Sequence, residues 1–422
     1  MYKIVGIIAE YNPFHTGHAR QIQIAREEAG ADCVIAVMSE TFVQRGEPAV
    51  FDKYIRTRMA LLGGADIVLG IPAPFSCAAA GDFALFGVSL LDALGADVLC
   101  FGSESGNLES LSFVADVLAE EPPAYRENLK QAMKAGKTFP EARAAAIRSF
   151  LSLLSAQASD GAQPFSSREE EKLQMLLSST NNILGIEYLL ALRKLGSSVT
   201  PFTHLREGSG YHSAKVPGEG AFASATALRH SLRSGITAEI LSFLPSGVSE
   251  VIKDEPALAA DDLSDLLDFL LLRGSLSPEE IEGFDTALSD RLRGMEPGAR
   301  SFTARAEYLK TRNYTETRVR RALIHLLLDI RKEDMARWKS HLPGYARILG
   351  FRKESSPFLS EIRKRAAVPL VTKTADAKSL LSPDALSLFE KETAAAHIYQ
   401  TLRSRRGPAF KNEYRQGPVI LP

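Results

Sequence analysis

Apolar residues in the first hundred positions alternate between short runs and longer amphipathic stretches. The short runs cover residues 4–8, 33–38, 67–71 and 98–101. Runs of this length and composition are typical of strands buried on both faces of a parallel sheet. Residues 18–28, 53–62 and 79–94 lie between them and carry helical spacing. Repeated strand–helix units predict an α/β, Rossmann-like domain whose ligands bind at the carboxyl ends of the strands.

Most of the remaining chain is predicted to be helical. Residues 155–171 are rich in Ser, Ala, Gln and Gly, which indicates a loose loop or insertion. Residues 198–202 fit a last strand, and beyond about Gly235 the pattern predicts only helix and loop. We therefore expect an α/β domain over residues 1–237 and a mainly α-helical region over residues 238–422.

Composition restricts the class of protein. The chain has 422 residues, 45% hydrophobic and 24% charged, as expected for a globular protein with more than one domain. No apolar stretch approaches the ~18 residues of a membrane span, and the first residues do not resemble a signal peptide. Cys33, Cys77 and Cys100 lie among apolar residues without metal-binding spacing. They are expected to be core residues of a cytoplasmic protein.

Charge is distributed unevenly along the chain. Residues 301–422 contain 24 Lys and Arg against 12 Asp and Glu, whereas the rest contains 26 against 39. A basic end joined to an acidic body predicts a polyanionic partner, and the alternative is a solvated surface on which charges happen to segregate. The basic residues around Tyr314 are Lys310, Arg312, Arg318, Arg320 and Arg321. They could bind RNA phosphates, or some could only cover the polar face of a helix, because residues 322–330 are apolar.

Two histidines follow the first predicted strand. His15-Thr16-Gly17-His18 comes after a turn at residues 10–14 and opens the next predicted helix. A helix N-terminus presents free N–H groups to anions, and two imidazoles can donate hydrogen bonds to a triphosphate. A zinc protease motif would need a glutamate between the histidines. The arrangement predicts a nucleotide phosphate site, with ordinary surface or core histidines as the alternative.

Further candidates for phosphate binding lie after later strands. Ser224, Thr226 and Arg229 place two hydroxyls and a guanidinium at the start of a helix, where an ordinary helix cap is the alternative. The remaining candidates are Gly102 in a turn after the fourth strand, Arg206 after the last strand, and Arg45 and Lys53 after the second. Arg45 and Lys53 could hold an acidic substrate or a nucleic-acid phosphate, or they could be solvated loop charges.

These motifs together resemble those of a known family. His15-x-Gly17-His18 and Ser224-x-Thr226-x-x-Arg229 are similar to the two phosphate motifs of HIGH-type nucleotidyltransferases. Residues 8–18, 42–49, 101–104 and 181–185 resemble the bacterial tRNA-Met cytidine acetate ligases. Residues 224–226, 317–325 and 349–351 extend this resemblance over most of the chain. It implies a Rossmann-like HIGH nucleotidyltransferase domain followed by a helical region.

The resemblance also implies a two-step reaction. Acetate would be activated by ATP to acetyl-adenylate, without acetyl-CoA. The acetyl group would then pass to the N4 amine of the wobble cytidine in elongator tRNA-Met, giving N4-acetylcytidine. Residues 1–237 would activate acetate and residues 238–422 would bind tRNA, with neither a membrane nor DNA as partner. Mg²⁺ is expected with ATP, although no dedicated carboxylate cage is visible.

Site residues follow from the same resemblance. His15 and His18 would be catalytic. The predicted ATP contacts are Ile7, Ile8, Ala9, Glu10, Tyr11, Asn12, Pro13, Phe14, His15, Thr16, Gly17, His18, Ala19, Arg20, Gly102, Asn181, Asn182, Arg206, Ser224, Thr226 and Arg229. The predicted substrate or tRNA contacts are Arg45, Lys53, Lys310, Arg312, Arg318, Arg320 and Arg321. Ser39-Glu40-Thr41 replaces the Ser-Gly-Asn-like turn usual in the family, so Glu40 is expected to bring a negative charge near acetate if this turn contacts the substrate.

Two other functions are compatible with the same motifs. One is a different HIGH-type adenylyltransferase that acts on a small cofactor precursor, although such enzymes do not need a basic C-terminal third. The other is a non-catalytic RNA-binding protein that senses ATP. It would bind ATP without releasing pyrophosphate.

Overall fold

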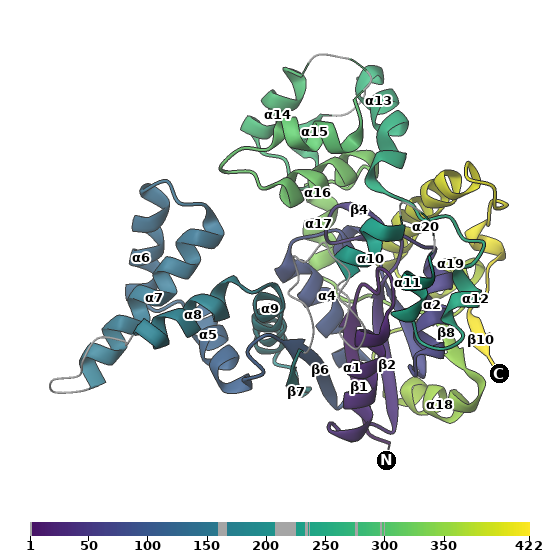
Figure 1. Ribbon diagram of the computed structural model, residues 1–422, viewed down its shortest axis with the longest axis horizontal. Helices are drawn as coiled ribbons and strands as arrows, with labels where there is room; N and C mark the ends of the chain where they lie inside the picture. Colours follow the sequence, from purple (N-terminus) through teal and green to yellow (C-terminus); the bar gives the residue numbers. More distant parts are fainter. Residues whose placement is uncertain are drawn as a thin grey trace.

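The chain is built around a central sheet (Figure 1). The computed structural model describes residues 2–158, 167–206, 225–232, 235, 237–274, 277–295, 298 and 300–422. The strand order is β10-β8-β5-β2-β1-β6-β7, and β9 (Leu370–Val371) pairs with β8 beside this row. The strands of the row are β1 (Ile4–Ala9), β2 (Cys33–Ser39), β5 (Ile67–Ile71), β6 (Val98–Ser103), β7 (Thr200–Leu205), β8 (Ala346–Arg352) and β10 (Val419–Leu421). A separate hairpin consists of β3 (Phe42–Val43) and β4 (Glu47–Pro48).

The predicted strands form the parallel part of the sheet. Strands β5, β2, β1, β6 and β7 pair in parallel. The first four coincide with the apolar runs and β7 with the predicted last strand at residues 198–202, with shifts of a few residues at the ends. The α/β fold class with a parallel sheet is therefore confirmed. Chain order reverses at β1, which has β2 on one side and β6 on the other. Such a switch point leaves a crevice at the carboxyl ends of the two strands, where ligands bind in open α/β sheets.

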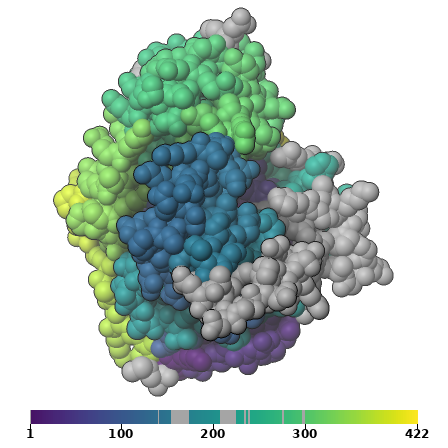
Figure 2. Space-filling model, turned by 90° about the vertical axis from the view of Figure 1, so that its left-hand side faces the viewer, coloured from purple at the N-terminus to yellow at the C-terminus, as the bar shows by residue number. Residues whose placement is uncertain are grey.

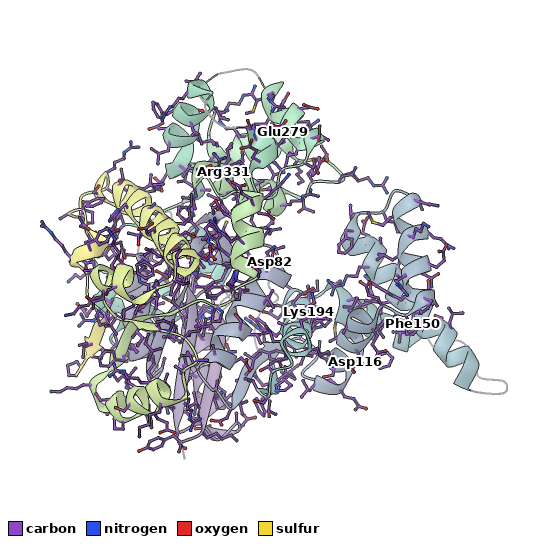
Figure 3. The ribbon with its side chains drawn as sticks, turned by 180° about the vertical axis from the view of Figure 1, so that it is seen from behind. Asp82, Asp116, Phe150, Lys194, Glu279 and Arg331 are labelled. Atoms are coloured by element: carbon purple, nitrogen blue, oxygen red, sulfur yellow. The ribbon has the colours of Figure 1, made fainter. Side chains whose placement is uncertain are left out.

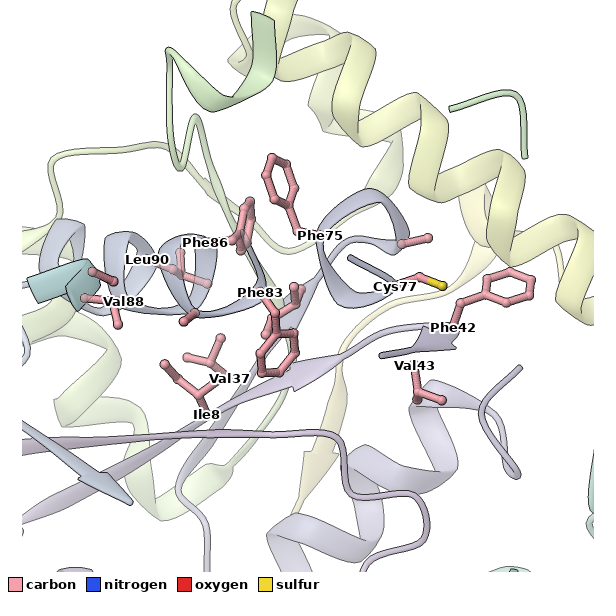
Figure 4. Packing of buried hydrophobic residues seen from close by; sticks show 14 of the residues in the cluster. Ile8, Val37, Phe42, Val43, Phe75, Cys77, Phe83, Phe86, Val88 and Leu90 are labelled. Atoms are coloured by element: carbon pink, nitrogen blue, oxygen red, sulfur yellow. The ribbon is translucent and has the colours of Figure 1, made fainter. Parts of the chain in front are cut away.

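Alternate residues of β1 enter two different cores, as the period of a strand requires. Ile8 faces α3 (Ala73–Ser76) and α4 (Ala80–Ala93), where Phe83 and Phe86 pack (Figure 4). Val5 and Ile7 face the opposite layer, which contains α1 (Thr16–Glu27) and α2 (Lys53–Leu62). The opposite layer also contains α10 (Ala225–Leu232), α11 (Ala238–Ser242) and α12 (Val248–Ile252). The sheet is thus covered on both faces.

The C-terminal part contributes strands to this sheet. β8 pairs antiparallel with β5, and β10 pairs parallel with β8. The expectation of only helix and loop beyond Gly235 is therefore wrong. β8 has the sequence Ala-Arg-Ile-Leu-Gly-Phe-Arg, whose arginines and glycine hide the apolar run of a strand. Its pairing partner lies almost 280 positions away, so local periodicity carries no signal of it. The division at residue 237 stays a prediction.

Two helical parts stand out from the sheet. An arm at the left of Figure 1 consists of α5 (Leu108–Glu120), α6 (Pro123–Lys134), α7 (Phe139–Ala158) and α8 (Ser167–Ser178), and its surface faces the viewer in Figure 2. α9 (Thr180–Leu195) joins the arm to the sheet through α4 and α5. The prediction of a loose loop over residues 155–171 is wrong at both ends, because α7 extends to Ala158 and α8 begins at Ser167. Residues 159–166 lie outside the described residues.

The second helical part, the upper module, precedes the last strands of the sheet. It contains α13 (Ser264–Arg273), α14 (Thr286–Arg293), α15 (Phe302–Leu309) and α16 (Glu316–Leu327). In Figure 3, Glu279 marks this module, whereas Phe150 and Asp116 mark the arm. The later helices are α17 (Lys332–Lys339), α18 (Ser356–Arg365), α19 (Ala377–Leu380) and α20 (Pro383–Ser404). None of the helices among the described residues is long and apolar enough to span a bilayer.

Candidate functional site

The two histidines form a stacked pair at the start of α1. His15 is the N-cap residue, and its Nδ1 accepts a hydrogen bond from the Gly17 backbone N–H at 3.1 Å. His18 Nδ1 accepts from the His15 backbone N–H at 3.3 Å. The two rings stack with their centroids 3.8 Å apart. Each ring therefore caps the helix with Nδ1, which is the pattern of a capping box made from two histidines.

This geometry fixes the tautomer of both rings. Because Nδ1 accepts, a neutral ring carries its proton on Nε2 and can donate it to a ligand. Burial lowers the pKa of His15 to about 3, and the positive charges of Arg206 and Arg229 add to this effect. Burial also lowers the pKa of His18 well below its usual value, with His15 and Arg206 as further causes. Both rings are thus neutral Nε2–H donors near pH 7.

A cavity of about 230 Å³ opens in front of the histidines at the carboxyl ends of β1, β6 and β7. We call it the nucleotide pocket. The predicted ATP contacts that line it are Ile8, Ala9, Glu10, Tyr11, Asn12, His15, Gly17, His18, Arg20, Gly102, Asn181, Arg206, Thr226 and Arg229. The predicted contacts that do not line it are Ile7, Pro13, Phe14, Thr16, Ala19 and Asn182, of which Ile7 and Phe14 are core residues. Ser224 lies outside the described residues.

Glu104 organises one wall of the nucleotide pocket. Its carboxylate accepts hydrogen bonds from the backbone N–H groups of Asn181 and Asn182 at the start of α9, at 3.2 and 2.8 Å. Asn182 is buried and bonds to Ser105, so it supports the loop rather than facing the pocket. Asn181 Oδ1 accepts from Arg206 at 2.9 Å. Asn181 therefore directs the guanidinium toward the pocket.

Two further guanidinium groups meet at Thr226, which also lines the nucleotide pocket. Arg45 and Arg229 both donate to the Thr226 hydroxyl, at 3.0 and 3.3 Å. Arg229 also donates to the Asn12 carbonyl at 2.7 Å, which ties α10 to the loop after β1. Arg45, predicted as a substrate contact, thus lies beside the predicted ATP contacts Thr226 and Arg229. Guanidinium groups in this arrangement are suited to an oxyanion.

Lys53 and Glu40 do not line the nucleotide pocket. Lys53 is 1% exposed and its Nζ lies 2.8 Å from Glu40, 3.0 Å from Glu413 and 3.6 Å from Glu392. Arg347 pairs with Glu40 at 3.1 Å and with Glu413 at 2.6 Å. We call these five residues the buried ion cluster. The structure therefore does not place Lys53 at a substrate, and the charge of Glu40 is paired with cations instead of facing the pocket.

The predicted tRNA contacts fall into two groups. Lys310 and Arg312 are exposed, and Arg318 pairs with Asp285 at 3.0 Å while its side chain stays 41% exposed. The other two turn inward. Arg320 pairs with Glu316 at 2.6 Å and lies 3.8 Å from Glu47, and Arg321 donates to the Gln44 carbonyl at 3.3 Å. Arg320 and Arg321 therefore hold the β3–β4 hairpin against α16.

Several pocket residues were missed by the sequence reasoning. They include Gln44, Phe83, Phe101, Glu104, Leu184, Tyr188 and His204. Phe83, Leu184 and Tyr188 lie on the helices α4 and α9, and their apolar spacing looks the same as that of core residues. The part of the chain that the structure describes contains no group of three His, Cys, Asp or Glu suited to a metal ion. The three cysteines are free and buried, as predicted.

The switch-point pocket, the capping histidine pair and the parallel sheet define a nucleotidyltransferase of the HIGH class. A family model described as HIGH Nucleotidyl Transferase matches residues 2–413. The crystal structure of Thermotoga maritima TmcAL (apo, form I) covers 99% of both chains with a TM-score of 0.88 at 31% identity. A second TmcAL structure, bound with alpha-thio ATP, gives a TM-score of 0.86.

Curated relatives of the chain show which family it belongs to within the HIGH class of nucleotidyltransferases. The tRNA(Met) cytidine acetate ligase of Thermoanaerobacter sp. (strain X514) is 37% identical over 403 residues, which is 94% of each chain. That of Syntrophotalea carbinolica is 38% identical over 414 residues, which is 95% of this chain and 94% of the relative. The chain belongs to the family of tRNA(Met) cytidine acetate ligases, and the resemblance drawn from the sequence is confirmed.

Proposed function

We propose that this chain activates acetate with ATP and transfers the acetyl group to N4 of the wobble cytidine in elongator tRNA-Met. The observation that carries the proposal is the histidine pair, because both rings present Nε2–H while Nδ1 is used by the helix. Family membership and the relative that binds alpha-thio ATP support it. The proposed location is the cytoplasm, where tRNA is modified and used.

In the first step, an acetate oxygen attacks the α-phosphorus of ATP and the bond to the β-phosphate oxygen breaks. Negative charge builds up on the departing pyrophosphate. The Nε2–H groups of His15 and His18 would donate to these phosphate oxygens, and the α1 N-terminus would stabilise the same charge. Arg206, Arg45 and Arg229, which line the same pocket, would bind the triphosphate oxygens. Such a reaction depends on positioning and electrostatics and needs no protein nucleophile.

Magnesium would be held by the phosphates rather than by a protein cage. The described residues offer no group of three suitable ligands. Mg²⁺ commonly retains several waters and binds substrate phosphates with few carboxylates. The side chains of the nucleotide pocket would act on the phosphate oxygens directly.

Transfer RNA would approach from the upper module. Lys310 and Arg312 are exposed there, and Arg318 keeps part of its guanidinium exposed above the Tyr314 ring, 4.7 Å from the ring centroid. These groups suit contacts with RNA phosphates. Arg320 and Arg321 would act indirectly, by holding the hairpin that carries Gln44 and Arg45 beside the nucleotide pocket.

The test measures acetate-dependent pyrophosphate release and N4-acetylcytidine in tRNA-Met incubated with ATP and labelled acetate. We expect both products, and we expect His18→Ala to lower pyrophosphate release by at least about 100-fold, the usual cost of losing a charge-stabilising donor. His341→Ala is the matched control, because His341 is exposed and does not line the pocket. Pyrophosphate release that does not depend on acetate would favour a different adenylyltransferase. ATP binding without release would favour an ATP-sensing RNA-binding protein.

A further inference from the structure

A second group of polar side chains lines the nucleotide pocket and is unsuited to binding a triphosphate. Glu10 follows the end of β1, and its Oε1 accepts a hydrogen bond from the Gln44 backbone N–H at 2.7 Å. Tyr188 of α9 borders the same cavity together with Phe83 of α4. A carboxylate repels phosphate, so Glu10 would face another part of the bound molecules. Phe83 and Tyr188 add aromatic walls beside it.

Two hydrogen-bonding atoms in this group lack a protein partner. Among the described residues, Tyr188 Oη and Gln44 Nε2 are buried and have no hydrogen-bond partner. The Tyr188 side chain is buried, with 2% exposure. An unpaired buried polar group costs about 1–3 kcal/mol, and native proteins keep few of them without a reason. Both residues line the pocket, and these two atoms are the donors in this group that no protein acceptor uses.

The charges around Glu10 suit a group that accepts a proton. Burial raises the pKa of Glu10, while Arg45, Arg229 and the Gln44 backbone N–H oppose this shift and Glu47 adds to it. The net effect is a pKa above the usual value for a glutamate. A general base works best when its pKa lies near the working pH. The raised pKa therefore suits Glu10 to accept a proton at the carboxyl end of β1, where ligands of this fold bind.

We infer that Glu10, Gln44 and Tyr188 form the site for the acceptor nucleobase, with Glu10 as general base of acetyl transfer. This inference rests on the proposed function. The Watson–Crick edge of cytosine presents one amine donor, N4–H₂, and two acceptors, N3 and O2. Glu10 would accept from the amine, as carboxylates do from cytosine N4. The two unpartnered donors, Gln44 Nε2 and Tyr188 Oη, would bind N3 and O2.

The same pattern disfavours uracil. Its O4 would face the Glu10 carboxylate at the place where cytosine presents the N4 amine, and two acceptors that face each other leave buried groups unpaired.

Acetyl transfer replaces a carbon–oxygen bond with a carbon–nitrogen bond. The N4 lone pair attacks the carbonyl carbon of acetyl-adenylate and forms the new C–N bond. The bond from that carbon to the phosphate oxygen breaks, and AMP leaves with the electron pair. The amine gives one proton to the Glu10 carboxylate. Because the N4 lone pair is delocalised into the pyrimidine ring, the amine is a weak nucleophile and the reaction needs a base.

Glu10→Gln tests the base directly. Glutamine keeps the shape and can still accept from the Gln44 N–H, so the fold is preserved. Because Glu10 is also a predicted ATP contact, acetyl transfer is compared with acetate-dependent pyrophosphate release. We expect the N4-acetylcytidine formed per pyrophosphate released to fall by about 100-fold or more, the usual range for a general base. Glu187→Gln is the matched control, because Glu187 precedes Tyr188 on α9, pairs with Arg143 at 2.6 Å and does not line the pocket.

Tyr188→Phe provides the second variant. Removing an unpaired hydroxyl should leave the melting temperature unchanged or raise it. Transfer efficiency, measured as kcat/KM for tRNA, should fall by about tenfold relative to the rate of pyrophosphate release, the size of one hydrogen bond to substrate. Normal acetyl transfer by both variants would overturn the proposed nucleobase site. A loss of acetyl transfer that is matched by an equal loss of pyrophosphate release would overturn it too. A wild-type chain that makes no acetyl-adenylate would instead refute the proposed function itself.

Discussion

The nucleotide pocket and the buried ion cluster both bring together charged residues from distant segments of the chain. The two regions use these charges in opposite ways. In the pocket, Arg45, Arg206 and Arg229 border a cavity. In the cluster, Lys53 and Arg347 are buried among Glu40, Glu392 and Glu413, with side-chain exposures of 0–5%. The cluster residues bind one another and do not line the nucleotide pocket, whereas the pocket arginines line a cavity that an anion can enter, although Arg229 also pairs with Glu47 at 3.4 Å. A basic residue after a strand therefore predicts a ligand site only where the fold leaves a cavity beside it.

The cluster also balances its own charge. Burial raises the pKa of Glu392 to about 8, and the neighbouring Glu40 adds to this shift. Burial alone would raise the pKa of Glu413, but Lys53 and Arg347 outweigh it and hold that pKa at about 2. Near pH 7 burial thus favours a protonated Glu392, which brings the charge of the cluster towards neutrality. The cluster joins the end of β2, α2, β8, α20 and the segment before β10, so its role is structural.

Lys53→Met gives the largest expected effect. It leaves Glu40 and Glu413 buried with Arg347 as their remaining partner. Breaking a buried ion pair on one side costs about 3–5 kcal/mol. We expect the free energy of unfolding, measured by urea denaturation, to fall by about this amount. The ATP dissociation constant of the folded fraction should stay within about twofold, and a large loss of ATP affinity without loss of stability would place Lys53 in the site after all.

Arg206→Met is the matched substitution in the pocket. Arg206 is exposed and donates to Asn181 Oδ1. Its removal should change the free energy of unfolding by less than about 1 kcal/mol, as at most surface positions. ATP affinity, measured by calorimetry, should fall by about 10- to 100-fold, the equivalent of about 1.5–3 kcal/mol for a hydrogen bond to a charged group. If stability fell as far as in Lys53→Met, the contrast between the two regions would be lost.

The sequence predicted the local parts of this molecule better than the distant ones. Strands β1, β2, β5 and β6 are short apolar runs, and the His15–His18 motif lies directly between a strand and a helix, so local pattern identifies them. The cluster depends on Glu392 and Glu413, which lie more than 330 positions from Lys53. Tyr188 shows the same limit, because nothing in its own helix distinguishes a pocket wall from a core position. Burial and pairing across the chain decide both cases.

The smallest expected effect is a change of stability with pH that comes from Glu392. Its pKa is raised from 4.5 to about 8 on folding. Between these values the folded state holds a proton that the unfolded state has lost, so stability falls as pH rises. From pH 7 to pH 8 the loss should approach about 1 kcal/mol, since one pKa unit is worth about 1.4 kcal/mol. Glu392→Gln keeps a neutral side chain that can bond to Thr41 and the Ala73 N–H. Urea denaturation at the two pH values should then show a flatter dependence than in the wild type, and an unchanged slope would mean that Glu392 is already ionised in the folded cluster.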